Sequence, residues 1–272
     1  MYPAQQSAEL LTFAAMALRT LSLLLSLMLV PASCLLAQDD DGEKSKKTEG
    51  NRIWTLDLNG GVDFPAADMA ERFGTSWRIG PAIKFKTASN WIFGARFDFL
   101  TGNKMRDDSL LSNLRTSQGG IVAQNGDVLN PGLFLRGYQC GISVGKIFPV
   151  LQMNANSGPF MMASTGFIQY KINIFDRDNS FPQLRDDYKK GYDRLTNGWY
   201  LEDFIGYMYF AKNKLINFYA GFNLMWGFTQ GRRDYQLDLG RPDTGSRNDI
   251  LTGFRVGWVL PIYRKNAEET YY

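Results

Sequence analysis

The feature of this sequence that most restricts its fold is a two-residue alternation of apolar residues with polar or small ones. It is clearest in residues 216–228, INFYAGFNLMWGF, where every second residue from Ile216 to Phe228 is apolar. Side chains of a β-strand point alternately to its two faces, so this period predicts a strand with one apolar and one wetter face. A strand tilted by about 45° crosses a bilayer in roughly 9–11 residues, and this segment is long enough.

Seven further segments repeat the alternation, and two of them are irregular. Pro81 predicts a bulge or a local break in its strand. The adjacent Glu202 and Asp203 lie in the least regular segment, because they cannot both face the same side. Eight strands are an even number, as in the closed antiparallel barrels of bacterial outer membranes, so the sequence predicts an all-β, eight-stranded antiparallel transmembrane barrel. The seven segments are residues 53–64, 77–86, 91–99, 134–148, 160–175, 199–210 and 250–263.

The connections between the segments alternate in length. Short turns are predicted at residues 87–90, 154–158 and 211–214, and long polar loops include residues 103–132, 176–198 and 231–248. In outer-membrane barrels the short turns lie on the periplasmic side and the long loops outside. The alternation therefore predicts that both ends of the barrel lie in the periplasm.

The first residues have the composition of an export signal. Arg19 precedes the apolar run Leu21–Val30, and small residues and Ala37-Gln38 follow before an acidic run. Met16 is an alternative start, and a lipoprotein-like site at Cys34 is an alternative to simple cleavage. The predicted organisation is a signal peptide at 1–38, a charged periplasmic linker at 39–52, an outer-membrane barrel at 53–263 and a short periplasmic tail at 264–272.

Alternation alone does not say which face of the strands is inside. A soluble lipocalin-like barrel also has eight strands, but its apolar side chains point inward around a ligand. Here one set of alternate residues, the polar phase, mixes acidic and basic residues with glycines. The other set, the apolar phase, is rich in aromatic residues near the strand ends, like the aromatic belts of membrane proteins at the membrane interfaces. We therefore expect a polar lumen. The predicted lumen charge network is Asp57, Asp63, Arg78, Lys84, Arg96, Asp98, Lys171, Glu202 and Arg255.

Composition argues against several functions. The 272-residue chain contains no histidine, which removes Ser-His-Asp and Cys-His catalysis and histidine-dependent metal sites. Its two cysteines, Cys34 and Cys140, predict no structural disulfide once the leader is removed. A net charge of +3 without a basic run gives no support for nucleic-acid binding. We expect no catalytic residue, cofactor or metal.

The eight alternating segments, the long loops, the export signal and the closing segment GFRVGWVLPIYRK resemble the small bacterial outer-membrane barrels of the OmpA, OmpX and opacity-protein type. The Ala37-Gln38 junction and the ending YRKNAEETYY are similar to versions found in the Bacteroidota. The resemblance covers about residues 53–263 and includes no diagnostic catalytic motif. Many such proteins end on an aromatic residue that the outer-membrane insertion machinery reads. Here Tyr263 has that place and leaves a tail, with Tyr272 as the alternative.

The resemblance and the pattern imply a non-enzymatic protein of the cell envelope in the bacterial outer membrane. We expect a structural or accessory role, a lumen plugged by charged side chains, and loops or a tail that engage an unidentified envelope partner. A narrow channel for small solutes and a soluble ligand-binding barrel remain alternatives. The last loop contains four arginines that either contact lipopolysaccharide or a partner, or pair with nearby aspartates in a solvated loop. They are Arg232, Arg233, Arg241 and Arg247, with Asp234, Asp238, Asp243 and Asp249 as the nearby acids.

Overall fold

The structure is a computed structural model that describes residues 52–107, 109–148, 156–176, 180–211 and 217–262. The predicted export signal, all but the last residue of the linker, Tyr263 and the tail lie outside these ranges. Predictions on those segments stay predictions.

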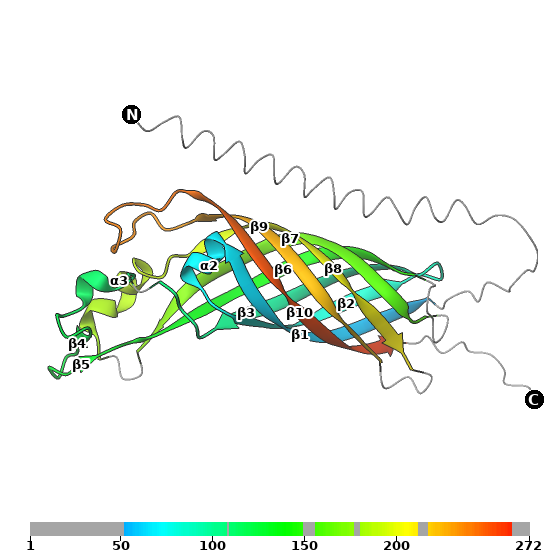
Figure 1. The fold of residues 1–272 in the computed structure, drawn as a ribbon, viewed down its shortest axis with the longest axis horizontal. Coiled ribbons are helices and arrows are strands. Elements are labelled where there is room, and N and C mark those ends of the chain that lie inside the picture. Colours follow the sequence, from blue (N-terminus) through cyan, green and yellow to red (C-terminus); the bar gives the residue numbers. More distant parts are fainter. Residues whose placement is uncertain (1–51, 108, 149–155, 177–179, 212–216, 263–272) are drawn as a thin grey trace, which may run out of the picture. The chain divides into compact units, whose positions relative to one another are not determined.

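Eight strands form a closed antiparallel barrel in which each strand pairs with its neighbours in the sequence (Figure 1). The first and last strands close the barrel along a continuous register from Trp54 opposite Ile262 to Ala67 opposite Asp249. The predicted all-β class and antiparallel eight-stranded barrel are therefore confirmed. The strands are β1 (Ile53–Ala67), β2 (Ser76–Lys86), β3 (Trp91–Gly102), β6 (Gly132–Ile147), β7 (Gly158–Phe175), β8 (Thr196–Phe210), β9 (Asn217–Gly231) and β10 (Ser246–Ile262).

The longer connections gather at one end of the barrel, where Figure 1 shows α2, α3, β4 and β5. At the other end β2 and β3 are joined by a tight turn that Asn90 enables by adopting a positive φ of 64°. The loop elements are α2 (Asp68–Arg72) after β1, η1 (Ser112–Leu114), β4 (Ile121–Val122) and β5 (Val128–Leu129) after β3, and η2 (Pro182–Leu184) and α3 (Asp186–Lys190) after β7. We call the end with these elements the loop end and the opposite one the turn end.

Side-chain exposure gives the facing of the strands. Trp199 and Phe222 point outward and are 67% and 71% exposed, whereas Glu202 and Arg255 point inward and are 2% and 1% exposed. The apolar phase therefore covers the outside and the charged phase fills the middle of the barrel. A lipocalin-like barrel has the opposite arrangement.

The middle of the interior is charged, and an apolar cluster lies toward each end of it. At the turn end the buried residues Phe160, Phe204 and Met208 belong to one apolar cluster. At the loop end a second cluster joins the inner face of β7, including Ile172, to loop residues such as Phe181. The barrel interior thus has an apolar layer on each side of the charged layer, which the alternating pattern did not predict.

Both irregular positions have a local explanation. Pro81 lies on the outer face, and β2 pairs with β3 at Ile79 and again at Ala82 in the same register, so the ladder is interrupted without a bulge. Proline has no backbone N–H to give to that ladder. In β8 the strand stays regular, which places Glu202 inside and leaves Asp203 exposed on the outer face.

Candidate functional site

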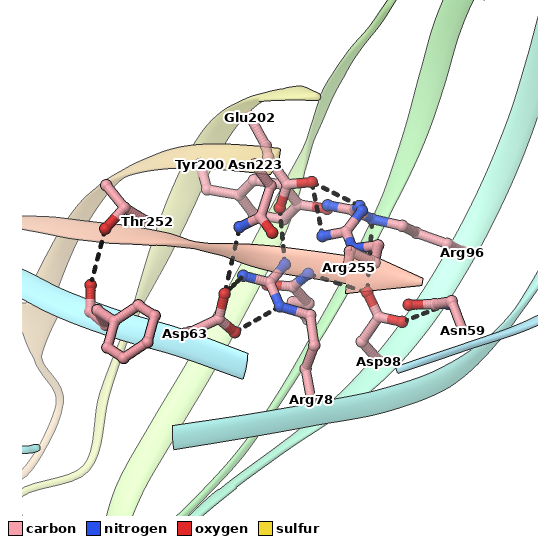
Figure 2. A network of polar contacts seen from close by, with 12 residues as sticks. Asn59, Asp63, Arg78, Arg96, Asp98, Tyr200, Glu202, Asn223, Thr252 and Arg255 are labelled. Atoms are coloured by element: carbon pink, nitrogen blue, oxygen red, sulfur yellow. Dashed lines mark hydrogen bonds and ion pairs between the residues drawn. The ribbon is translucent and has the colours of Figure 1, made fainter. Parts of the chain in front are cut away.

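The charged layer of the barrel is centred on Glu202 of β8 (Figure 2). Its Oε2 accepts a hydrogen bond from Nη1 of Arg78 at 2.8 Å. Its Oε1 accepts bonds from Nη1 of Arg96 at 2.6 Å and from Nη2 of Arg255 at 2.7 Å. Because these arginines come from β2, β3 and β10, one carboxylate connects walls on opposite sides of the barrel.

Two further carboxylates balance the three arginines. Asp63 accepts a bidentate pair from Arg78, with Nε to Oδ2 at 2.5 Å and Nη2 to Oδ1 at 2.6 Å. Asp98 lies 3.6 Å from Nε of Arg96, measured to Oδ2. Three guanidinium groups thus face three carboxylates. This neutrality matters because an unpaired charge buried in a protein costs several kcal/mol.

Neutral side chains complete the layer. Asn59 donates to Asp98 at 2.9 Å and Gln139 donates to the same carboxylate at 3.0 Å. Asn223 donates to Asp63 at 3.2 Å. Sequence reasoning did not assign these residues to the site, although all three lie in the same alternating phase as the charged residues. Their place in this phase was the sequence signal that could have assigned them to the site.

Lys84 and Asp57 form a separate ion pair in the barrel interior. Nζ of Lys84 lies 2.6 Å from Oδ2 of Asp57 and 3.9 Å from the ring centre of Tyr219. Tyr219 belongs to the turn-end apolar cluster, so this pair lies beside that layer. Eight of the nine residues predicted for the lumen network are buried inside, divided between this pair and the layer around Glu202.

Lys171 does not belong to the network, and its predicted place needs correction. It lies on the outer face of β7, its side chain is 45% exposed, and its Nζ is 3.8 Å from Oδ2 of Asp193 in a loop. The alternation misassigned it because loops fold over the loop end of the barrel. There the inner face of β7 packs against Phe181 and other apolar loop residues, so Ile172 points inward and the polar phase points out.

The loop arginines are held mostly by polar groups of the chain itself. Arg233 donates to both oxygens of Asp193, with Nε at 2.8 Å from Oδ1, and Nε of Arg232 donates to Oδ1 of Asn197 at 2.6 Å. Arg241 is exposed, and its carbonyl oxygen accepts a bond from the backbone N–H of Gln236.

Arg247 and Arg72 of α2 both bind the carboxylate of Asp243. Nη2 of Arg247 donates to Oδ2 of Asp243 at 3.0 Å, and Nη2 of Arg72 donates to the same oxygen at 2.8 Å. Burial opposes ionisation of Asp243, but these hydrogen bonds and the two positive charges outweigh it and lower the pKa of the carboxyl below its ordinary 3.8. The last loop is thereby fastened to the loop between β1 and β2.

Within the ranges that the structure describes, no group of three or more Asp, Glu or Cys side chains is arranged to hold a metal ion. No helix among these residues is both long enough and apolar enough to cross a membrane. The charged layer binds its members to one another and so connects strands on opposite sides of the barrel.

Comparison with known proteins gives weak likenesses. No protein-family model matches the chain, and no curated protein matches it. Among solved structures, it is similar to Neisserial surface protein A, with 10% identity and a TM-score of 0.42 over 75% of this chain and 96% of that one. It is also similar to the N-terminal β-barrel domain of Pseudomonas aeruginosa OprF, with 9% identity and a TM-score of 0.35 over 77% of this chain and 99% of that one. At these TM-scores neither likeness bears on function, and the fold rests on the strand pairing of the chain itself.

Proposed function

We propose that this protein is a non-enzymatic barrel of the bacterial outer membrane with a structural or accessory role in the envelope. The observation that carries the proposal is a band of exposed apolar side chains around the outside of the barrel. Trp77, Phe93, Ile142 and Leu201, from four different strands, are all more than two-fifths exposed. Water-soluble proteins rarely leave so large a continuous apolar surface uncovered.

The height of this band fits a membrane. Outward-facing aromatic residues lie ten positions apart along three strands, and such a segment rises about 33 Å, or about 23 Å across a membrane when tilted by about 45°. The apolar band of outer-membrane barrels is about 25 Å tall and is flanked by aromatic girdles. The three pairs are Trp54 and Phe64 on β1, Trp199 and Tyr209 on β8, and Phe218 and Phe228 on β9.

The edge of the band is sharp at the loop end. Phe167, Trp199 and Phe228 lie opposite one another across β7, β8 and β9. Two residues further toward the loops, the corresponding outward positions are Gln169, Asn197 and Gln230. A change from three aromatic to three polar side chains within one step along the strands is expected where lipid chains give way to headgroups and water.

The filled interior supports a structural role over a channel. The arginine–carboxylate layer crosses the barrel, and an apolar cluster lies on each side of it. Eight-stranded barrels have an interior just wide enough for side chains to fill. We therefore expect the wild-type protein to conduct little current.

Membrane fractionation, heat-modifiable migration in gels and planar-bilayer recording test the proposal together. The folded protein should be found in outer membranes and should migrate differently before and after boiling. The wild type should show no large steady conductance, whereas Arg96→Ala combined with Arg255→Ala should open small conductances. Replacing the loop residues Arg232 and Arg241 by Ala is the matched control and should leave the recording silent. A soluble wild-type protein would refute the membrane role, and a large stable wild-type conductance would favour the narrow channel.

A further inference from the structure

Two cations face each other on the outside of the barrel at its loop end. Arg136 of β6 lies directly opposite Lys171 of β7 in the strand register, and both side chains point outward. Like charges directly opposite each other on one face of a sheet are destabilising. The arrangement therefore calls for an anion between or beside them.

Within the described part of the chain, the neighbouring groups do not supply enough negative charge to balance this pair. Arg136 donates to the hydroxyl oxygen of Thr101 and to the carbonyl oxygen of Leu135, and its guanidinium lies 5.2 Å from the ring centre of Phe134. Among the described residues, no carboxylate forms an ion pair with Arg136. All three partners are uncharged, so the positive charge of Arg136 is not balanced.

Lys171 is only loosely neutralised. Its one acidic neighbour among the described residues is Asp193, at 3.8 Å. Both oxygens of Asp193 already accept hydrogen bonds from Arg233. The Arg136–Lys171 pair therefore presents close to two positive charges to the outside.

The depth of the pair matches the headgroup layer of the proposed membrane. Phe167, which marks the edge of the apolar band, faces Cys140, and the next outward pair toward the loops is Tyr138 with Gln169. The Arg136–Lys171 pair is one step further, about 13 Å along the strands or about 9 Å in depth beyond Phe167. Long basic side chains bend back toward the interface, so both cations reach the level of lipid phosphates.

We propose that Arg136 and Lys171 bind a phosphate of an outer-leaflet lipid, a proposal that rests on the membrane location inferred above. The guanidinium offers a planar fork for two phosphate oxygens and the ammonium adds a point charge. A phosphate monoester carries nearly two negative charges, which matches this pair better than the single charge of a phosphodiester. The proposed ligand is therefore a lipid phosphomonoester of the outer leaflet, such as lipid A, with its acyl chains against Tyr138 and Phe167.

The proposal places the lipid contact away from the last loop. Arg233 and Arg247 bond to carboxylates of the chain, and Arg232 bonds to an amide oxygen. A phosphate would have to displace these partners. Arg136 and Lys171 need no such exchange, because no carboxylate in the described ranges pairs with Arg136 and the only ion pair of Lys171 there is the long one to Asp193.

The test uses the full exported chain in phosphatidylcholine nanodiscs, with lipid A as the titrated probe. Replacing both Arg136 and Lys171 by Gln should weaken binding by about tenfold or more, since two charge-assisted contacts are lost. The matched control replaces Lys146, an outward cation at the turn end, and Lys190, an exposed loop cation, by Gln. This control removes the same charge and should bind as the wild type does.

Two further arms identify the ligand. The wild type should bind lipid A without its phosphates about tenfold or more weakly than it binds phosphorylated lipid A. This expectation does not depend on any variant folding. Inorganic phosphate at millimolar concentration should not compete, and competition would overturn the lipid as the source of the phosphate. Equal binding of phosphorylated and dephosphorylated lipid A, or of wild type and double variant, would overturn the site. Flotation of the wild type with vesicles and its heat-modifiable migration report on the membrane role separately.

Discussion

Two adjacent carboxylates on β8 test directly which face of the strands is inside the barrel, because Glu202 faces the charged layer and Asp203 faces outward. We expect Glu202→Gln to destabilise the folded barrel strongly. We expect Asp203→Asn to be neutral or slightly stabilising. Both substitutions remove one negative charge and keep nearly the same shape, so each is the matched control for the other.

The difference in free energy follows from the contacts. Glu202 accepts bonds from Arg78, Arg96 and Arg255 at 2.6–2.8 Å, all fully or nearly fully buried. A hydrogen bond to a charged group contributes about 1.5–3 kcal/mol, and removing one partner of a buried ion pair costs about 3–5 kcal/mol. A glutamine keeps one acceptor but turns an amide toward an arginine, so we expect a loss of about 3–5 kcal/mol. A charge on the lipid face costs up to about 2–4 kcal/mol for basic residues and less for Asp, so removing that of Asp203 should gain about 0–1 kcal/mol.

Urea unfolding in lipid vesicles, followed by tryptophan fluorescence and heat-modifiable migration, measures both values. The spectroscopic midpoint should fall for Glu202→Gln and should be unchanged or higher for Asp203→Asn. Equal losses for the two variants would contradict the outward facing of Asp203 and the central role of Glu202. A larger loss for Asp203→Asn would mean that the register of β8 is shifted by one residue.

Three other predictions concern facing, acid sensitivity and topology. Phe222→Arg on the apolar outer face should cost roughly 2–4 kcal/mol and impair insertion. Asn223→Arg places its charge in the polar lumen and should be electrostatically milder, with any cost coming from steric crowding; equal tolerance of the two in a folding assay would contradict the facing. The folded pKa of Asp243 lies below its unfolded value, so the stabilisation that its ionised form gives the last loop is fully present above the unfolded pKa and is lost as the pH falls through the folded pKa. Limited proteolysis below pH 4 should therefore cut this loop faster. In the Asp243→Asn variant the loop should be cut faster already at neutral pH. The labelling experiment uses a variant in which the native cysteine of β6 is replaced. In this variant a cysteine at Ser117 should react with an impermeant maleimide on intact cells, and one at Asn156 should react only after the outer membrane is breached. The reverse pattern would mean that the barrel is inserted with its long loops in the periplasm.

The sequence by itself determined the strands of the barrel and their number. A period of two is a property of each segment, independent of what lies across the barrel, so each alternating segment could be recognised locally. It also identified the charged set of alternate residues in the middle of the barrel, because inward residues such as Asp57, Arg78 and Arg255 alternate with apolar outward ones within each segment. The placement of the short connections together at one end followed from their alternation in length with the long loops.

Only the tertiary structure decided which charges meet. Arg78 and Glu202 are 124 residues apart and lie on opposite walls, so their contact depends on barrel closure and stagger, which no local pattern encodes. The structure also decided that Asp203 faces outward and that Lys171 leaves the lumen. At the loop end the inner wall packs against folded loops instead of other charges, and the same alternation then has the opposite meaning: apolar residues point inward and polar residues meet headgroups and water.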